Sequence, residues 1–313
     1  MSQPLISICI PTYKRPQLLK KLLDSIQIQR FKDFEILIND NSPDDSVEVV
    51  LQPYLQVLSI SYEKNQPAVS AGMNSKKVMQ RATTEWIKLM HDDDWFEGPD
   101  ALACFAEAAL QTNTDFIFSA SNQVQLQTGQ SKAAMFSSEK KQMLDNSPFC
   151  LLYENIIGQP SVTMHKRHPG ITYDESFNFL LDIDFYVRYF LAHPGYHYID
   201  QRLINIGISP QQETYKYYKN INIELPEYFT LLSKFGEDLN IKNKYAFHLV
   251  WNMLKRYKIK HTDQIRAVGY KGPMPAQIEA IIAYQKYIPN IILKQTPWSK
   301  KLMAMCYKKI IAG

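Results

Sequence analysis

The first 120 residues alternate short apolar runs with amphipathic stretches, and this pattern restricts the fold more than any other feature of the sequence. Residues 5–10 form a nearly continuous apolar run, which is typical of a strand covered on both faces. Residues 17–28 then place apolar side chains at helical spacing, after Pro16 in a position suited to a first helical turn. The pattern continues with expected strands at 34–38, 57–62, 86–90 and 115–119 and expected helices at 70–82 and 99–110. It predicts an α/β fold with a parallel sheet.

Polar residues directly follow four of these expected strands. They are Thr12-Tyr13, Asn39-Asp40, Asn65 and Asp92-Asp93-Asp94. In open sheets of this kind, ligands bind just outside the carboxyl ends of the strands. We therefore expect the four clusters to converge on one binding site.

The triplet Asp92-Asp93-Asp94 is costly to assemble, because like charges at close range raise each other's pKa. A divalent cation would remove that cost. Mg²⁺ and Mn²⁺ prefer carboxylate oxygens as ligands and are often coordinated by substrate phosphates as well. A solvated loop or a set of helix-capping acids is the alternative for an arbitrary acidic triplet. The strand before it and the neighbouring clusters favour a metal site.

After the α/β pattern, prolines interrupt residues 130–210, and a helical pattern begins near residue 215, with helices expected at 244–258 and 275–287. No internal repeat or low-complexity linker separates these parts. We expect an α/β domain at 1–214, with two halves at about 1–120 and about 121–214. A helical, basic region is expected at 215–313.

Charge is divided unevenly along the chain. Residues 244–313 hold 13 Lys or Arg against two acids, a net +11, whereas the whole chain has a net charge of +4. Such asymmetry indicates an anionic partner for the basic end, and nucleic acid, anionic lipid and a charged polysaccharide precursor all fit. Trp298, Leu302 and Met305 lie at helical spacing among lysines in this end, which predicts a helix lying on an anionic membrane. A terminal helix packed on the core, with a solvated basic face, is the alternative.

No apolar run reaches the length of about 18 residues that a membrane-spanning helix needs. The first residues lack the basic and apolar segments of a signal peptide. The four cysteines are scattered and favour a reducing compartment. We expect a cytoplasmic protein, peripheral on the inner face of the membrane if the basic helix binds there.

Four segments occur in an order that resembles glycosyltransferase family 2: SICIPTYKRPQLLKKLLDSI, FEILINDNSPDDS, YEKNQPAVSAGMN and TTEWIKLMHDDDWFEGPDAL. The resemblance covers about residues 5–210 and implies a donor half at about 1–120 and an acceptor half at about 121–214. It implies the GT-A fold, a Rossmann-like and mostly parallel sheet flanked by helices. It also implies an inverting, metal-dependent enzyme that moves a sugar from a nucleotide-sugar, UDP-linked, to a glycan or lipid-linked glycan of a bacterial surface polysaccharide. A nucleic-acid partner is not expected.

The resemblance also implies residue roles. The nucleotide loop matches Pro11, Thr12, Tyr13 and Arg15; Asp40 matches the acid that contacts the base; Asn65 and Asn74 match asparagines of the next nucleotide-side segment. The triplet matches the DxD motif, with Asp94 as the principal Mn²⁺ or Mg²⁺ ligand, Asp92 as a further ligand, and Asp92 or Asp93 on the ribose. Alignment on Trp95 would instead place His91 at the first acid of the motif, so the register stays open.

The segment LDIDFYVR at 181–188 resembles the family's second-half element and makes Asp182 the catalytic base, with Asp184 as the fallback. A carboxylate in hydrogen-bond reach of an acceptor hydroxyl can take its proton as the hydroxyl attacks. The alternative from the residues alone is that Asp182 caps the helix that follows.

Some positions depart from the family pattern. Pro67 and Ala68 replace a usual glycine, and Thr84 stands where a glycine often precedes the strand. No basic residue or histidine lies near 206–208 to hold the diphosphate, so Gln211, Gln212 or a nearby lysine would substitute. Residues 165–168, His-Lys-Arg-His, belong either to the acceptor side or to a basic surface turn.

Two other functions fit parts of the sequence. A nucleotidyltransferase on a related sheet would use metal-binding acids, but it needs a Gly-rich phosphate loop, which residues 11–15 lack. A non-catalytic sugar-binding relative would not need acids at both the strand end and position 182.

Overall fold

The computed structural model describes residues 3–210, 212, 217–236, 239, 243–274, 276–294 and 296–312. The chain forms two compact units, residues 1–148 with 156–212, and residues 149–155 with 213–313. The second unit thus includes a short segment, 149–155, from within the expected α/β domain.

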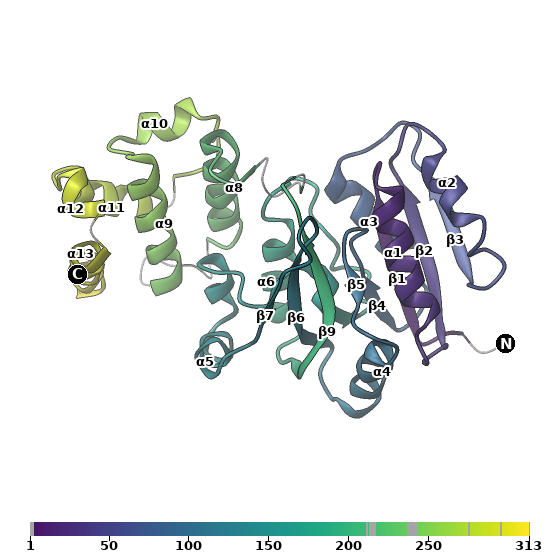
Figure 1. Cartoon of the computed structure of the whole chain (residues 1–313). Coiled ribbons are helices and arrows are strands. Elements are labelled where there is room, and N and C mark those ends of the chain that lie inside the picture. Colours follow the sequence, from purple (N-terminus) through teal and green to yellow (C-terminus); the bar gives the residue numbers. More distant parts are fainter. Residues whose placement is uncertain are drawn as a thin grey trace. The chain divides into compact units, whose positions relative to one another are not determined.

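The first unit is built on one mixed sheet (Figure 1). Within the described residues it has nine strands, in the order β3-β2-β1-β4-β8-β6-β9-β5, with β7 beside β6. The strands are β1 Ile6–Thr12, β2 Phe34–Asp40, β3 Ile60–Lys64, β4 Trp86–Leu89, β5 Trp95–Phe96, β6 Phe116–Gln125, β7 Ser131–Ala134, β8 Thr163–Lys166 and β9 His197–Ile208. Strands β1 to β4 are parallel, as the sequence predicts, whereas β8 lies antiparallel between β4 and β6.

The helices of this unit are α1 Pro16–Gln27, α2 Ser46–Leu51, α3 Ala71–Arg81, α4 Ala101–Gln111, α5 Ser138–Asn146 and α6 Leu181–Ala192, with short 3₁₀ turns at Pro148–Leu152 and Pro160–Val162. Helix α3 begins where the Ser70 side chain accepts a hydrogen bond from the backbone of Met73, a standard N-cap. Almost every residue of β1 is buried, which confirms a strand covered on both faces. The first unit is therefore a mixed sheet with helices packed on it.

Two strands begin or end at residues other than those predicted from the sequence. The third begins at Ile60 and not at residue 57, because the backbone of Val57 and Leu58 bonds to Tyr54 in the turn after α2. The strand expected at 115–119 extends to Gln125, because β9 pairs with it in parallel along its length.

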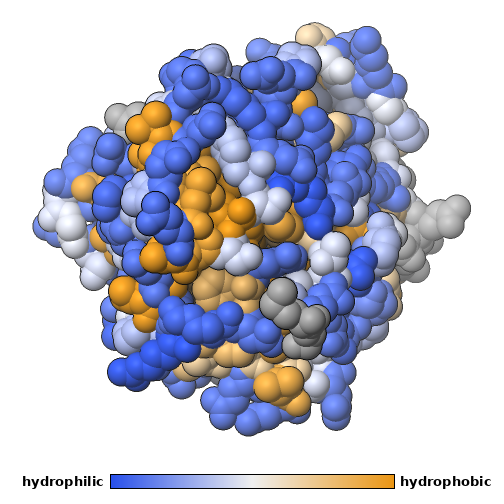
Figure 2. All heavy atoms as spheres, turned by 90° about the vertical axis from the view of Figure 1, so that its right-hand side faces the viewer, coloured by the Kyte–Doolittle hydropathy of each residue, from blue (hydrophilic) through white to orange (hydrophobic). Residues whose placement is uncertain are grey.

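Figure 2 shows the side of the molecule on which β3 and α2 lie. It is mainly hydrophilic, with smaller hydrophobic patches. Val49, Leu55 and Val57, on α2 and the turn after it, are exposed apolar residues. The core lies instead between the helices and the sheet.

The second unit is helical: α8 Ile221–Lys234, α9 Lys244–Tyr257, α10 Thr262–Ala267, α11 Ala276–Gln285, α12 Asn290–Lys294 and α13 Thr296–Ala312. Helix α9 is its buried element, with Phe247 and Trp251 among its core residues. Helix α13 packs on α9, since the Trp251 indole donates to Ser299 at 3.2 Å and the Phe247 ring lies 5.2 Å from that of Tyr307. None of the helices in the described part of the chain combines the length and the apolar character needed to span a bilayer.

Candidate functional site

The carboxyl ends of β1, β2 and β3 are tied together by two asparagines. The Asn74 side chain, on α3, donates to the backbone oxygens of Thr12 at 3.3 Å and Asn39 at 3.1 Å. Asn65, after β3, donates to the Asn74 side chain at 2.7 Å. The strand-end clusters therefore converge, as the sequence predicts.

Asp92 closes this group from the end of β4. Its carboxylate accepts hydrogen bonds from the Thr12 hydroxyl at 2.8 Å and the Tyr13 backbone at 3.3 Å. The Arg15 guanidinium lies 3.2 Å from Asp92 and 3.0 Å from Asp93, so one cation bridges two acids of the triplet. Burial raises the pKa of Asp92 to about 6, although the charge of Arg15 opposes the rise.

Asp94 is held by the backbone of β9. The Gly207 N–H donates to its carboxylate at 3.0 Å. A Cβ atom at position 207 would lie 2.2 Å from the Asp93 carbonyl oxygen, so β9 can come this close only with glycine there. Burial, followed by the charge of Asp93, raises the pKa of Asp94.

Among the described residues, His91, Asp93 and Asp94 form a group whose potential ligand atoms lie within 4.8 Å of one another. Two buried carboxylates that carry close negative charge suit a hard cation such as Mn²⁺ or Mg²⁺. The Asp92 carboxylate is engaged by Thr12 and Arg15. Its role as a metal ligand stays a prediction.

Asp40 is fully buried at the end of β2. Its two oxygens accept from the Tyr62 hydroxyl at 2.9 Å and the Ser42 backbone at 2.7 Å. Tyr62 was not among the residues predicted from the sequence. It lies on β3 opposite Ile38 of β2, so only the strand register brings it to Asp40.

Asp182 lies within the first turn of α6 and is partly exposed. The helix N-cap is Leu180, so the interpretation of Asp182 as a capping residue is wrong. The Tyr173 hydroxyl donates to its carboxylate at 3.2 Å. Burial raises the pKa of Asp182, and the charge of His91 acts against that rise, as it also does at Asp94. The predicted base and the metal-site candidate thus share His91 as a neighbour.

Asp184, two residues on, has a different environment. It is fully buried, and Arg188 approaches one of its oxygens through two nitrogens, at 2.8 and 2.6 Å. The Arg188 guanidinium also donates to the Thr172 carbonyl at 2.6 Å. Asp184 therefore pairs with Arg188 within α6, and Arg188 links the helix to the segment that contains Thr172.

Residues 165–168 do not form the basic surface turn that was one interpretation of them. His165 is buried in β8 against Phe116 and Phe185, and burial lowers its pKa to about 4. His168 lies 3.2 Å from Asp115 and stacks on His193. Whether this segment contacts the acceptor stays a prediction.

The diphosphate-side residues are only partly described. The Gln212 side chain donates to the Gly207 carbonyl at 2.6 Å, beside the β9 segment that holds Asp94. Gln211, the other candidate substitute, lies outside the described residues.

Known proteins resemble this chain in sequence and in fold. A beta-1,3-glucosyltransferase of Campylobacter jejuni, named for a GalNAc(5)-diNAcBac-PP-undecaprenol acceptor, is 38% identical over 94 residues, 29% of this chain and 30% of that protein. For this protein and two other curated relatives, the matched region covers between 30% and 63% of the relative's own length.

Solved structures extend the likeness to most of the fold. TarS residues 1–349 of S. aureus, in complex with UDP-GlcNAc, gives a TM-score of 0.61 at 14% identity, covering 89% of this chain and 78% of that one. The mannosyltransferase PcManGT of Pyrobaculum calidifontis, in complex with GDP-Man and Mn²⁺, gives 0.50 at 13% identity, covering 100% and 76%.

The family profile settles membership. The profile of glycosyl transferase family 2 matches residues 7–184, more than half of the chain, and that stretch includes the strand-end clusters, the acidic triplet and Asp182. The chain belongs to glycosyl transferase family 2.

Proposed function

We propose that the protein is an inverting glycosyltransferase that moves a sugar from a UDP-linked donor to a lipid-linked or other glycan acceptor in surface-polysaccharide synthesis. The observation that carries the proposal is the site at the strand ends. Asp40, Asp92 and Asp94 are buried and held by hydrogen bonds there, while Asp182 shares His91 with the triplet.

The nucleoside binds along the ends of β1 to β3. Asp40 accepts hydrogen bonds only, and a uracil N3–H is a matching donor. Tyr62 and Ser42 fix the position of that carboxylate. The UDP-GlcNAc complex of TarS, a neighbour in fold, supports a uridine donor, whereas the GDP-Man complex of PcManGT shows that other bases occur on such folds.

Asp93 and Asp94 hold the cation, with His91 beside them, and Asp92 orients the nucleotide loop through Thr12 and Arg15. When bound, Mn²⁺ or Mg²⁺ supplies Lewis-acid stabilisation of the charge on the diphosphate. The Mn²⁺ in the PcManGT complex supports this choice. Arg15 adds a fixed positive charge at the same place.

Asp182 takes the proton of the acceptor hydroxyl as its oxygen attacks the anomeric carbon from the face opposite the diphosphate. The C–O bond to the acceptor forms while the bond to the diphosphate breaks, so configuration inverts and no enzyme nucleophile is required. The raised pKa of Asp182 makes it a stronger base than an ordinary aspartate. Tyr173 orients the carboxylate.

Calorimetric titration with UDP, GDP, CDP and ADP, each with and without Mn²⁺, tests the donor assignment. We expect UDP to bind most tightly, and Mn²⁺ to strengthen its binding at least tenfold. Equal affinity for all four nucleotides, or no effect of Mn²⁺, would contradict the proposal. The UDP-sugar is then identified by donor hydrolysis.

We further propose that α13 brings the enzyme to the membrane that carries a lipid-linked acceptor. Trp298 and Met305 are 56% and 52% exposed, and the helix carries lysines around them. The undecaprenol named for the Campylobacter relative supports a lipid-linked acceptor. Helix α13 also packs on α9, as the alternative interpretation expects, so the anchor would use only its outer face.

Co-sedimentation with phosphatidylglycerol vesicles tests the anchor. Trp298→Ser with Met305→Ser should release the protein from the vesicles, whereas Tyr287→Ser, at a 78% exposed aromatic elsewhere in the unit, should not. Equal binding of both variants and the wild type would dismiss the anchor.

A further inference from the structure

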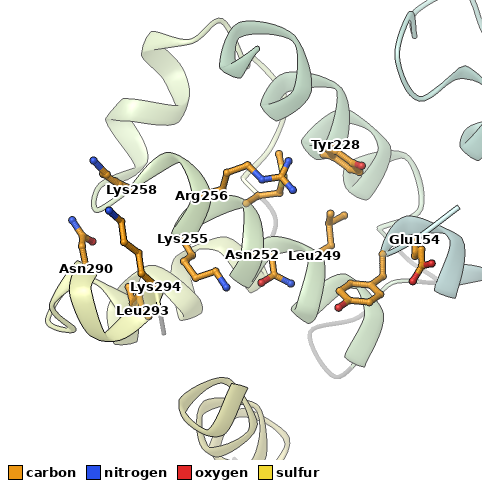
Figure 3. A pocket seen from close by; sticks show the side chains of 12 residues that line it. Glu154, Tyr228, Leu249, Asn252, Lys255, Arg256, Lys258, Asn290, Leu293 and Lys294 are labelled. Carbon is orange, nitrogen blue, oxygen red and sulfur yellow. The ribbon is translucent and has the colours of Figure 1, made fainter. Parts of the chain in front are cut away.

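The helical unit contains a cavity of about 550 Å³ that none of the roles above uses. It lies between α8, α9, α12 and the segment 149–155, so the second unit alone supplies its lining (Figure 3). Its volume is within the range of small-molecule sites and exceeds the needs of a lone phosphate.

Four cations line this cavity: Lys255, Arg256, Lys258 and Lys294. Glu154 is the one acid among the lining residues, and Glu224, just outside, pairs with Arg256 at 3.0 Å. The ammonium groups of Lys258 and Lys294 have no hydrogen-bond or ion-pair partner within the part of the chain that the structure describes. The cavity therefore has an excess of positive charge.

Lys255 lies among these cations. Burial, followed by the charges of Arg256 and Lys300, lowers the pKa of Lys255. The carboxyl end of α9 offsets part of the positive charge, since a helix C-terminus carries about half a negative charge. Lys258 and Lys294 are exposed, so an anion in the cavity would meet two ammonium groups that have no protein partner among the described residues.

The two ends of the cavity are lined by different kinds of side chain. Figure 3 shows Lys258 and Lys294 at one end, with Tyr228 and Glu154 at the other and Asn252 between them. Tyr153, at 42% exposure, adds a second aromatic ring to the lining. Aromatic faces pack on sugar rings, and amide and carboxylate groups pair with hydroxyls.

We propose that this cavity binds a phosphorylated saccharide, with its phosphate at Lys258 and Lys294 and its sugar toward Tyr153 and Tyr228. An extended polyanion such as nucleic acid fits less well, because the two lysines lie at one end of the cavity while Glu154 and Tyr228 lie at the other (Figure 3). The ligand is separate from the donor, whose proposed residues all lie in the first unit. The inference therefore goes beyond the proposed function.

Glucose 1-phosphate and inorganic pyrophosphate, titrated calorimetrically in the presence of EDTA, probe the cavity without a metal-loaded donor site. The test variant is Lys258→Gly with Lys294→Gln. Lys258 has φ 55°, a left-handed conformation that glycine adopts freely, so the change removes a charge without straining the end of α9. Lys271→Gln with Lys308→Gln removes the same charge from exposed lysines outside the cavity.

We expect the cavity variant to weaken binding of glucose 1-phosphate at least tenfold, and the control variant to weaken it less than twofold. A Tyr153→Ala variant should weaken glucose 1-phosphate but not pyrophosphate, since only the former carries a sugar ring. Equal affinities in the cavity and control variants would overturn the proposal. So would binding to phosphatidylglycerol vesicles that the cavity variant loses and the control variant keeps, without binding of glucose 1-phosphate, because a membrane headgroup would then be the ligand of the cavity.

The same preparations are titrated with UDP and Mn²⁺ to distinguish the cavity from the proposed donor site. The cavity variant should bind UDP as the wild type does. Loss of UDP binding in the cavity variant would overturn the separation of the sites, whereas a failure of UDP to bind the wild type would contradict only the proposed donor.

Discussion

The acidic triplet at the end of β4 and the first turn of α6 both present aspartates, but the structure treats them differently. Asp92 accepts from Thr12 and the Tyr13 backbone and pairs with Arg15, and Asp94 accepts from Gly207. Asp182 is held by Tyr173 and is not paired with a cation in the described structure. The triplet is thus fixed by several donors, whereas Asp182 keeps an oxygen for another proton.

This contrast corresponds to two roles in the proposed site, binding of the diphosphate and removal of a proton. Groups that bind a charged diphosphate gain from being fixed in place before the ligand arrives. A general base must instead stay able to accept a proton, and a raised pKa helps it. The neighbouring Asp184 shows the third possibility, a carboxylate neutralised by Arg188 that serves the fold.

Among substitutions on the binding side of the site, Asp94→Asn should have the largest effect on transfer. The change removes one negative charge from the proposed cation site, and transfer at low Mn²⁺ should fall about a thousandfold, since metal stabilisation is worth several kcal/mol. Excess Mn²⁺ should restore part of the rate. Glu107→Gln, at an exposed acid of α4, is the matched control and should leave the rate unchanged. An unchanged Mn²⁺ requirement in Asp94→Asn would remove this residue from the metal site.

Gly207→Ala tests whether the close approach of β9 holds the acidic triplet in place. The added methyl would meet the Asp93 carbonyl, so β9 or the 91–94 turn must shift, at a cost of about 1–3 kcal/mol in the free energy of unfolding. Donor affinity should fall about tenfold or more, because Asp94 then loses its backbone donor. Gly170→Ala is the control, since a Cβ there meets nothing within 4 Å. Melting temperature and UDP affinity report both effects, and normal values for Gly207→Ala would mean that the close approach does not matter.

Tyr62→Phe has the smallest expected effect. It removes the hydroxyl that donates to buried Asp40 and leaves the ring in place. Loss of one hydrogen bond to a charged group, about 1.5–3 kcal/mol at most, should weaken UDP binding roughly tenfold while the Mn²⁺ requirement stays unchanged. Tyr287→Phe is the control. A UDP affinity equal to that of the wild type would show that Asp40 does not depend on Tyr62.

The binding side of the site was largely predictable from the sequence, and the supporting contacts were not. Thr12 ends β1, and Asn65 and Asp92 come after β3 and β4, so the carboxyl ends of parallel strands bring these residues together. Tyr62 reaches Asp40 only through the β2–β3 register, which no local pattern encodes. Gly207 meets the triplet through the pairing of distant strands.

One of the two interpretations of residues 165–168 is wrong because a strand enters the sheet out of sequence order. His165 stands in a run of basic residues that resembles a surface turn, yet β8 enters the sheet between β4 and β6 and buries its ring. Lys88 is likewise buried in β4, with its ammonium against the Ser161 carbonyl. Such burial depends on tertiary pairing, and residue type alone predicts the opposite.

The most direct test of the division of labour is single-turnover transfer by Asp182→Asn, with UDP affinity measured on the same preparation. We predict a loss of about 10²–10⁴ in rate, the usual contribution of a general base, with UDP affinity within about twofold of the wild type. Because the base must be charged, the wild-type kcat at saturating donor and Mn²⁺ should fall as pH drops through the raised pKa of Asp182, and the variant should lack that fall. Retained transfer, or a loss of UDP binding that matches the loss of rate, would contradict the assignment of proton removal to Asp182.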